Sequence, residues 1–283
     1  MPVDETNYIH DVDKPLTSTA IESYAISRWL LSRIENARQR SGLEQSKFRI
    51  LDFGCGRGQT VASLRLRGYQ AWGVDVHSKW IEFARPGFRS AGLDADDLLR
   101  LAPEGGQAPF EAGHFDFIYS VSVMEHVENL SAVMDEIARL TAPGASGFHQ
   151  FIGSHSLFEG HLRMPLVHWL PKNEMRCRAI KLCLQLGIDP QWEVVDTKGV
   201  DDKAEFYYRF SVDQTFYRPC ACYLRAFEAA GLQAKLDILE HPKISHRVGP
   251  LLSVPYVRRV LDAGVAAFLA VNITTVKPRP VAR

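Results

Sequence analysis

Ile50-Leu51-Asp52-Phe53-Gly54-Cys55-Gly56-Arg57-Gly58 is the stretch that decides the fold of this 283-residue chain. A short apolar run ends in an acid and three alternate glycines, and a helical pattern over residues 60–67 follows directly. Because glycine has no Cβ, the backbone can turn sharply there and a ligand can lie against it. The positive end of the helix then faces any carboxylate or phosphate of that ligand. The stretch predicts a nucleotide-type site at the first strand–helix turn of a doubly wound sheet.

The spacing of the glycines argues against a dinucleotide as the ligand. The pattern G-x-G-x-x-G would need a glycine at position 59, where the chain has Gln59. A second apolar run, residues 71–74, ends at Asp75 roughly twenty residues further on, as ribose-binding acids do. A carboxylate at that place can accept hydrogen bonds from two ribose hydroxyls, so a nucleoside is expected.

Three motifs together resemble the class I S-adenosylmethionine (SAM)-dependent methyltransferases. Residues 50–58 are similar to the first motif of that family, and Asp75 is similar to its ribose-binding acid. Residues 115–127, which end in Glu125-His126-Val127, resemble its fourth strand and the turn after it. The resemblance implies SAM as the cofactor, with S-adenosylhomocysteine as its product. It also implies an α/β fold, a doubly wound Rossmann-like sheet of seven mostly parallel strands with an antiparallel last strand.

The same resemblance implies which residues contact the cofactor. The sequence Asp-Ala-Asp-Asp-Leu at 94–98 is similar to the family turn whose acid accepts the adenine amino group. The expected cofactor-binding residues are Asp52, Gly54, Cys55, Gly56, Gly58, Asp75, Val76, Asp94, Ala95 and Ser120.

Apolar periodicity and turn residues predict the remaining elements. A helix is expected from a cap at Ser18 or Thr19 to Gly42, and the helix after residue 78 should stop before Pro86, because proline disfavours the helical conformation just before it. Strands are expected at 88–93, 115–121, 146–152, 232–240 and 269–276. Residues 243–268 are expected to include an inserted amphipathic helix at 257–268.

Four regions follow from this reading. Residues 1–47 form an N-terminal arm and helix, 48–153 the SAM-binding core, and 216–283 the rest of the core. Residues 154–215 separate the fifth strand from the next family helix, so they are interpreted as an insertion that covers the acceptor site and recognises the substrate. Its helix at 172–187 carries basic residues, which predict either a solvated face or contact with an acidic substrate or a membrane.

The expected chemistry is methyl transfer to a hydroxyl. The sulfonium of SAM is already activated, but an alcohol acceptor must lose a proton, and histidine is the usual base near neutral pH. His126, His155 and His161 all fall at the carboxyl edge of the predicted sheet. We favour His161 as the catalytic base, because it lies in the insertion two residues after Glu159. His126 is the second candidate for the base.

No resident metal is expected. Proteins similar to the ubiquinone-pathway O-methyltransferases and the small-RNA 2′-O-methyltransferases carry E-x-x-E-H after the fourth strand, and this motif binds a divalent metal. Here the first glutamate is replaced by Ser122. Glu125, His126 and a histidine such as His155 could still supply three ligands, but the loss of an anionic oxygen argues against magnesium.

The composition of the chain limits the classes of acceptor and the location that we expect. The 33 basic and 33 acidic residues balance, so the basic surface of an RNA-directed enzyme is not expected. Five cysteines without a C-x-x-C pair, a polar start and no long apolar run predict a cytoplasmic protein without signal peptide or transmembrane segment. A hydroxyl of a small metabolite, a sugar or glycan, or a natural product is the preferred acceptor. RNA, a lipid or quinone, or SAM binding without catalysis are the alternatives, and homo-oligomerisation and peripheral membrane contact stay open.

Overall fold

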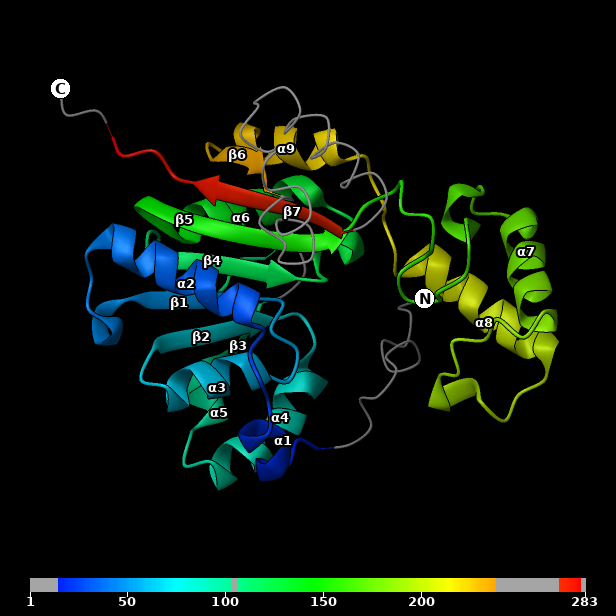
Figure 1. Cartoon of the computed structure of the whole chain (residues 1–283), viewed down its shortest axis with the longest axis horizontal. Coiled ribbons are helices and arrows are strands. Elements are labelled where there is room, and N and C mark those ends of the chain that lie inside the picture. The colour runs from blue at the N-terminus through cyan, green and yellow to red at the C-terminus, as the bar shows by residue number, and fades with distance from the viewer. Residues whose placement is uncertain (1–14, 103–105, 238–269, 281–283) are drawn as a thin grey trace, which may run out of the picture.

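A computed structural model describes residues 15–102, 106–237 and 270–280, which form a seven-stranded sheet in the order β3-β2-β1-β4-β5-β7-β6 (Figure 1). Strands β1 to β5 pair with one another in parallel, and β7 is antiparallel to both β5 and β6. This order confirms the predicted doubly wound, Rossmann-like sheet. The strands are β1 (Arg49–Phe53), β2 (Gln70–Asp75), β3 (Leu99–Leu101), β4 (Phe115–Val121), β5 (Thr141–Ile152), β6 (Gln233–Leu236) and β7 (Ala270–Val276).

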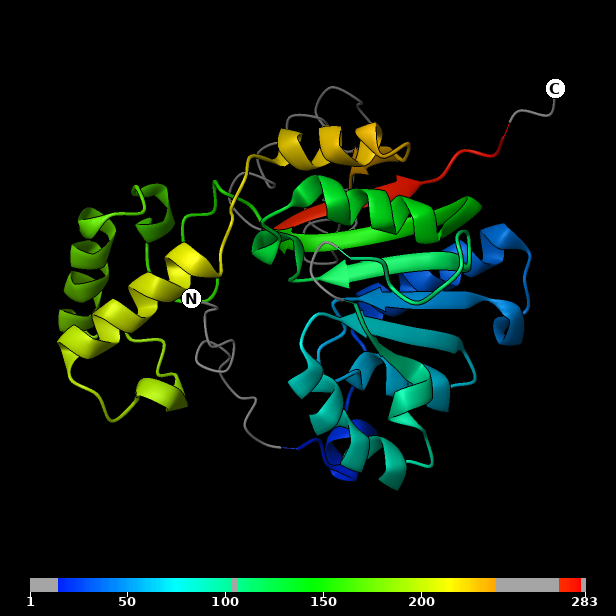
Figure 2. The ribbon, with the colours of Figure 1, turned by 180° about the vertical axis from the view of Figure 1, so that it is seen from behind.

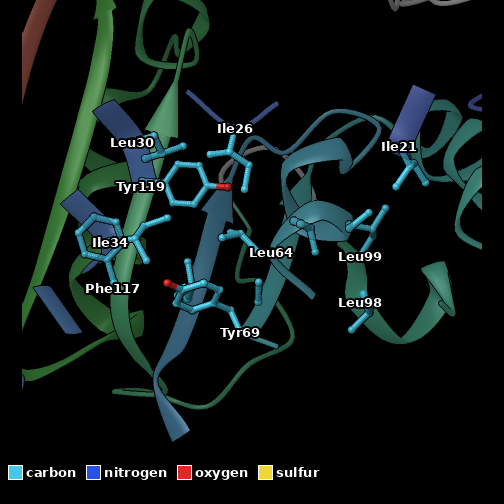
Figure 3. Packing of buried hydrophobic residues seen from close by; sticks show 14 of the residues in the cluster. Ile21, Ile26, Leu30, Ile34, Leu64, Tyr69, Leu98, Leu99, Phe117 and Tyr119 are labelled. Atoms are coloured by element: carbon cyan, nitrogen blue, oxygen red, sulfur yellow. The ribbon is translucent and has the colours of Figure 1, made fainter. Parts of the chain in front are cut away.

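Helices cover both faces of the sheet (Figures 1 and 2). One apolar cluster packs α2 (Arg28–Ser41), α3 (Gln59–Leu66) and α4 (Ser78–Ser90) on one face, and a second packs α6 (Leu130–Leu140) and α9 (Cys220–Ala229) on the other. Neighbouring residues Ile50 and Leu51 belong to opposite clusters, as alternation along a strand requires. Figure 3 shows Leu30 of α2 beside Tyr119 of β4 in the first cluster.

The N-terminal helix differs from its prediction. It is divided into α1 (Ser18–Glu22) and α2, and a short 3-10 turn, η2 (Gln45–Lys47), follows. The hydroxyl of Thr17 caps α1, and that of Ser27 accepts a hydrogen bond from the N–H of Leu30 at the start of α2. Ile26 between the two helices is buried, so the break points an apolar side chain into the core. Residues 1–14 of the expected arm and the helix expected at 257–268 lie outside the described residues.

The prediction for the third strand was wrong. The helix α4 continues through Pro86 to Ser90, and β3 begins only after the short helix α5 (Ala95–Leu98). Proline costs α4 one backbone hydrogen bond, but the helix gains the complete burial of Phe88 two residues later. The packing of Phe88 in the core therefore outweighs the local preference of the sequence.

Residues 154–215, which we call the helical unit, lie beyond the carboxyl ends of the strands (Figures 1 and 2). Their elements are η4 (Val167–Trp169), α7 (Glu174–Gln185), η5 (Glu193–Val195) and α8 (Val200–Asp213). They have an apolar cluster of their own, which includes Ile180, Trp192 and Tyr207. Across the described ranges, no helix is both long enough and apolar enough to cross a bilayer.

Two basic residues of the helical unit serve its internal structure. Arg176 is buried and donates hydrogen bonds to the carbonyl oxygens of Leu170 and Ser211. The Nζ of Lys172 donates to the carbonyl oxygen of Thr215 at 2.8 Å. Arg176 is therefore not part of a solvated basic face, whereas Lys172 is exposed and also satisfies a carbonyl group just after α8.

A buried ion pair connects α2 to the far edge of the sheet. Nη1 of Arg33 lies 2.5 Å from Oδ2 of Asp237, just after β6, and the hydroxyl of Thr274 on β7 donates to the same oxygen. The guanidinium also lies over the ring of Phe148, 4.5 Å from its centroid. Burial opposes ionisation of Asp237, but the hydrogen bonds from Arg33 and Thr274 lower its pKa below the ordinary value.

Replacing Asp237 by alanine should lower the free energy of unfolding by about 3–5 kcal/mol, because it removes one partner of a buried ion pair. Urea unfolding at neutral pH measures the loss. The control is Glu205→Ala, which removes an exposed ion pair with Arg209 and should cost less than about 1 kcal/mol. Since the pKa of Asp237 is lowered on folding, the difference from wild type should shrink as the pH falls through that pKa. A loss equal to that of the control would contradict this role.

Candidate active site

The glycine loop between β1 and α3 is fixed on two sides and open on a third. The N–H groups of Gly54 and Cys55 both donate to the carbonyl of Val74, at 2.8 and 2.9 Å. Gly54 has a φ of 81°, and a Cβ there would lie 2.3 Å from the side chain of Val123. A Cβ on Gly56 would meet no heavy atom within 4 Å. The loop therefore offers bare backbone to open space at Gly56, where the sequence predicts the cofactor.

Asp75 ends β2 directly beside this loop. Its Oδ2 accepts the N–H of Gly56 at 2.7 Å, and its Oδ1 accepts the N–H of His77 at 3.0 Å. Burial raises the pKa of Asp75, although these two amides oppose the shift. Each carboxylate oxygen has a second lone pair, so the side chain can still accept two ribose hydroxyls. The structure thus brings the predicted ribose acid to the glycine loop.

The other predicted cofactor residues of β1, β2 and β4 differ in how accessible they are. Asp52 is buried, and burial raises its pKa to about 7. Val76 is 47% exposed, which leaves its side chain free to cover a ligand. Ser120 is fully buried, and its hydroxyl lies 2.9 Å from Nδ1 of His149. The hydroxyl of Ser120 therefore faces the core, and only its backbone could contact the cofactor.

The structure places Asp94 and Ala95 before the third strand, whereas the predicted adenine contact requires them after it. They come before β3, whose register sets Leu99 opposite Gly73 and Leu101 opposite Asp75. A strand parallel to β2 is entered at the amino edge, whereas ligands bind at the carboxyl edge. The carboxylate of Asp94 caps α5 by accepting the N–H of Asp96. The misplaced third strand caused this error.

Two of the predicted catalytic histidines meet at the carboxyl edge. His126 belongs to the 3-10 turn η3 (Met124–His126), which follows Val123, and His161 belongs to the loop after β5. Their Nε2 atoms are 3.1 Å apart. His155 lies outside this pair, because its ring is exposed and contacts the hydroxyl of Ser154.

Glu159 holds His161 in place. Its fully buried carboxylate accepts hydrogen bonds from the N–H of His161, the N–H of Leu162, the ring Nδ1 of His161 and the hydroxyl of Tyr217. Burial would raise the pKa of Glu159, but these hydrogen bonds and the charge of His161 lower it. Gly160 between them is needed, because a Cβ there would lie 1.8 Å from Ile152.

The segment that follows α8 returns to the histidine pair. The carbonyl of Gln214 lies 2.6 Å from Nδ1 of His126, and the N–H of Phe216 donates to the carbonyl of Glu125. The guanidinium of Arg218 donates to the carbonyl of Val127 at 2.7 Å. No local pattern in the sequence indicates these residues or Tyr217, because they are separated from their partners by 56 to 91 positions.

Glu125 completes the group. Its carboxylate is fully buried, and burial raises its pKa to about 7. Burial lowers the pKa of His126 to about 4, whereas the hydrogen bond and charge of Glu159 overcome burial and raise the pKa of His161. Ligand atoms of Glu125, His126 and His161 all lie within 4.8 Å of one another, so they could hold a metal ion. The histidine that joins them is His161, not the His155 that the sequence suggested.

Fold and site together define a class I SAM-dependent methyltransferase. A family model described as a methyltransferase domain matches residues 22–183, more than half of the chain, and the chain belongs to this family. SAM is therefore its methyl donor.

Individual relatives are similar over shorter segments. The chain is 31% identical over 96 residues to a ubiquinone biosynthesis O-methyltransferase of Bordetella pertussis, a match that covers 34% of this chain and 39% of that protein. It is 35% identical over 97 residues to methyltransferase GfsG of Streptomyces halstedii, with 34% of each chain covered. The fold also resembles that of a SAM-dependent methyltransferase from Mesorhizobium loti, with a TM-score of 0.50 at 14% identity over 91% of this chain and 100% of that one.

Replacing Asp75 by alanine should weaken SAM binding by about 10²–10⁴-fold, because two charge-assisted hydrogen bonds to ribose are lost. Calorimetric titration with SAM measures the effect, and thermal melting verifies that the variant is folded. Asp94→Ala is the matched control and should leave the affinity unchanged, since Asp94 precedes β3 and its carboxylate caps α5. Equal affinities for Asp75→Ala and wild type would refute the ribose assignment.

Proposed function

We propose that this methyltransferase transfers the methyl group of SAM to a hydroxyl of a small organic molecule. The observation that carries the proposal is the pair His126 and His161, held by polar partners at the carboxyl edge of the sheet. A carbon or thiolate acceptor would need little beyond correct placement, whereas a hydroxyl must lose its proton near the transition state. The name of the Bordetella relative, an O-methyltransferase, agrees with this choice.

The residues divide the work between binding and proton handling. SAM supplies an activated methyl group, so the chain has to position it. Asp75 and the backbone at Gly56 are proposed to hold its nucleoside part. The turn that carries His126 follows Val123, which packs on the glycine loop, so the histidine pair lies beside the predicted cofactor. We assign the acceptor's hydroxyl proton to this pair.

The helical unit is proposed to recognise the acceptor. It lies beyond the strand ends, and Phe210 of α8 contacts the ring of His161, with centroids 5.4 Å apart (Figure 1). Near His161 in the sequence, Phe158 is 58% exposed and Trp169 is 50% exposed. Such aromatic side chains can pack against a sugar ring or an aromatic ring. They favour a phenolic or quinol hydroxyl as the second candidate acceptor, beside the sugars and natural products that the sequence favours.

Isotope transfer tests the proposal directly. Purified protein is incubated with methyl-labelled SAM and a panel of sugars, phenols and catechols, with matched amines and thiols in parallel. The proposed function predicts label in an O-methyl product. Label only on nitrogen, sulfur or carbon acceptors would contradict O-methylation while leaving the methyltransferase class intact.

Replacing His161 by alanine should reduce turnover by about 10²–10⁴-fold, the usual contribution of a group that handles a proton. SAM affinity should stay unchanged, because the variant leaves Asp75 and the glycine loop intact. Initial rates with saturating SAM and calorimetric titration separate the two effects. His155→Ala is the control and should keep its rate, since His155 lies outside the pair. Full turnover by His161→Ala would exclude His161 from the reaction.

A further inference from the structure

We propose that Glu125, His126 and His161 bind a divalent transition-metal ion of the Zn²⁺ type, and that the ion fastens the helical unit to the edge of the sheet. The catalytic use of the ion rests on the proposed function, but its binding does not. This proposal replaces the expectation from the sequence that the chain carries no metal.

The tautomers of the two histidines point to a cation between them. Nδ1 of His126 lies 2.6 Å from the carbonyl oxygen of Gln214, which can only accept, so this nitrogen carries a proton. Nδ1 of His161 lies 3.1 Å from the carboxylate of Glu159. The hydroxyl of Tyr217 donates its one proton to that same carboxylate, so it cannot donate to His161, and Nδ1 of His161 also carries a proton. In their neutral forms both rings therefore direct a lone pair from Nε2 toward the other, across 3.1 Å. A positive charge, either a shared proton or a metal ion, belongs at this point.

Glu125 favours a metal ion over a proton. Its carboxylate is fully buried, and neither oxygen has a hydrogen-bond partner among the described residues. Its own N–H and that of Ile152 lie close enough to influence it, but neither reaches hydrogen-bond geometry. A proton shared by the histidines would leave this carboxylate without a partner, whereas a divalent ion would satisfy all three side chains.

The spacing needs only a small adjustment. The three ligand atoms lie within 4.8 Å of one another, and ligands about 2.1 Å from a metal are roughly 3–3.5 Å apart. Rotation of the Glu125 side chain, which no hydrogen bond restrains, can supply the difference.

The donor set selects the kind of metal. Two imidazoles and one carboxylate suit Zn²⁺, Co²⁺ or Fe²⁺, whereas Mg²⁺ prefers oxygen ligands. Ser122, at the position of the first glutamate of E-x-x-E-H, offers no carboxylate that would favour magnesium. The partners of the two Nδ1 atoms are also typical of a metal site, because ligating histidines usually donate their second N–H to a carbonyl or a carboxylate. Gln214 and Glu159 provide one of each.

The ligands come from two parts of the chain. Glu125 and His126 belong to the turn after β4, and His161 belongs to the helical unit. An ion at this place would therefore connect the helical unit to the sheet, beside the hydrogen bond from the N–H of Phe216 to the carbonyl of Glu125. Because the ion would occupy the Nε2 lone pairs of both histidines, the ion and not a histidine would then acidify the acceptor hydroxyl.

The test measures binding of the metal alone, without SAM or acceptor. The full chain, free of any affinity tag, is treated with a chelator, dialysed and titrated by calorimetry with Zn²⁺, Co²⁺ and Mg²⁺. Visible absorption of the Co²⁺ complex reports ligation by nitrogen and oxygen. Glu125→Gln and His161→Ala remove one ligand each. His114→Gln is the matched control, because His114 is half-buried at the other end of β4.

We expect one Zn²⁺ per chain for wild type and His114→Gln, and weaker binding of Mg²⁺. Affinity for Zn²⁺ should fall at least about 100-fold in Glu125→Gln and His161→Ala, since even changes in outer contacts cost about 10–100-fold. The ion should also raise the melting temperature of wild type but not of these two variants.

Three results would overturn the proposal. No stoichiometric binding of Zn²⁺ or Co²⁺ would mean that the histidines share only a proton. Unchanged affinity in both ligand variants would place the ion elsewhere, and tighter binding of Mg²⁺ than of Zn²⁺ would refute the donor-set argument. Metal binding without methyl transfer would instead contradict the proposed function alone, and methyl transfer by the metal-free protein would contradict only a catalytic use of the ion.

Discussion

The buried carboxylate of Glu159 is the interaction on which the candidate active site depends. It accepts four hydrogen bonds, two from backbone amides of its own loop and one each from the ring of His161 and the hydroxyl of Tyr217. A buried carboxylate is stable only when its lone pairs are satisfied, so this loop has little freedom. Glu159 therefore fixes the direction of the His161 ring and joins the start of the helical unit to the segment that follows it.

The sheet determines where this interaction can act. Parallel strands bring the ends of β1, β2, β4 and β5 to one edge, where the glycine loop, Asp75, the turn with His126 and the loop with His161 all begin. The contact of Val123 with Gly54 connects the glycine loop to that turn. The predicted cofactor site and the histidine pair are thus neighbouring parts of one edge, and the helical unit lies beyond them (Figure 2).

The sequence was most informative where local patterns coincide with function. The glycine loop, β2 and β4 were predicted at their observed positions, because alternate glycines and short apolar runs leave few other conformations. The prediction of the third strand was wrong because burial of Phe88 favours the continuation of α4 past Pro86. No local sequence pattern indicates this burial. Because the third strand was predicted too early in the chain, Asp94 was expected after this strand, whereas it precedes β3.

The active site was predictable only in part, for a similar reason. His126 and His161 could be proposed because each follows a strand at the carboxyl edge. Tyr217 and the carbonyl of Gln214 could not, since only the packing of α8 brings them back to the histidines. The sequence favours His161 over His155 because Glu159 lies two residues before it, and in the structure the carboxylate of Glu159 contacts His161 and not His155.

One edge of the sheet is proposed to present the methyl donor to the histidine pair. A crystal structure with S-adenosylhomocysteine tests it most directly. The account predicts ribose hydroxyls on the carboxylate of Asp75, the nucleoside against the backbone of Gly56, and the sulfur facing His126 and His161. A ligand whose sulfur faces away from both histidines, or whose ribose does not contact Asp75, would contradict it.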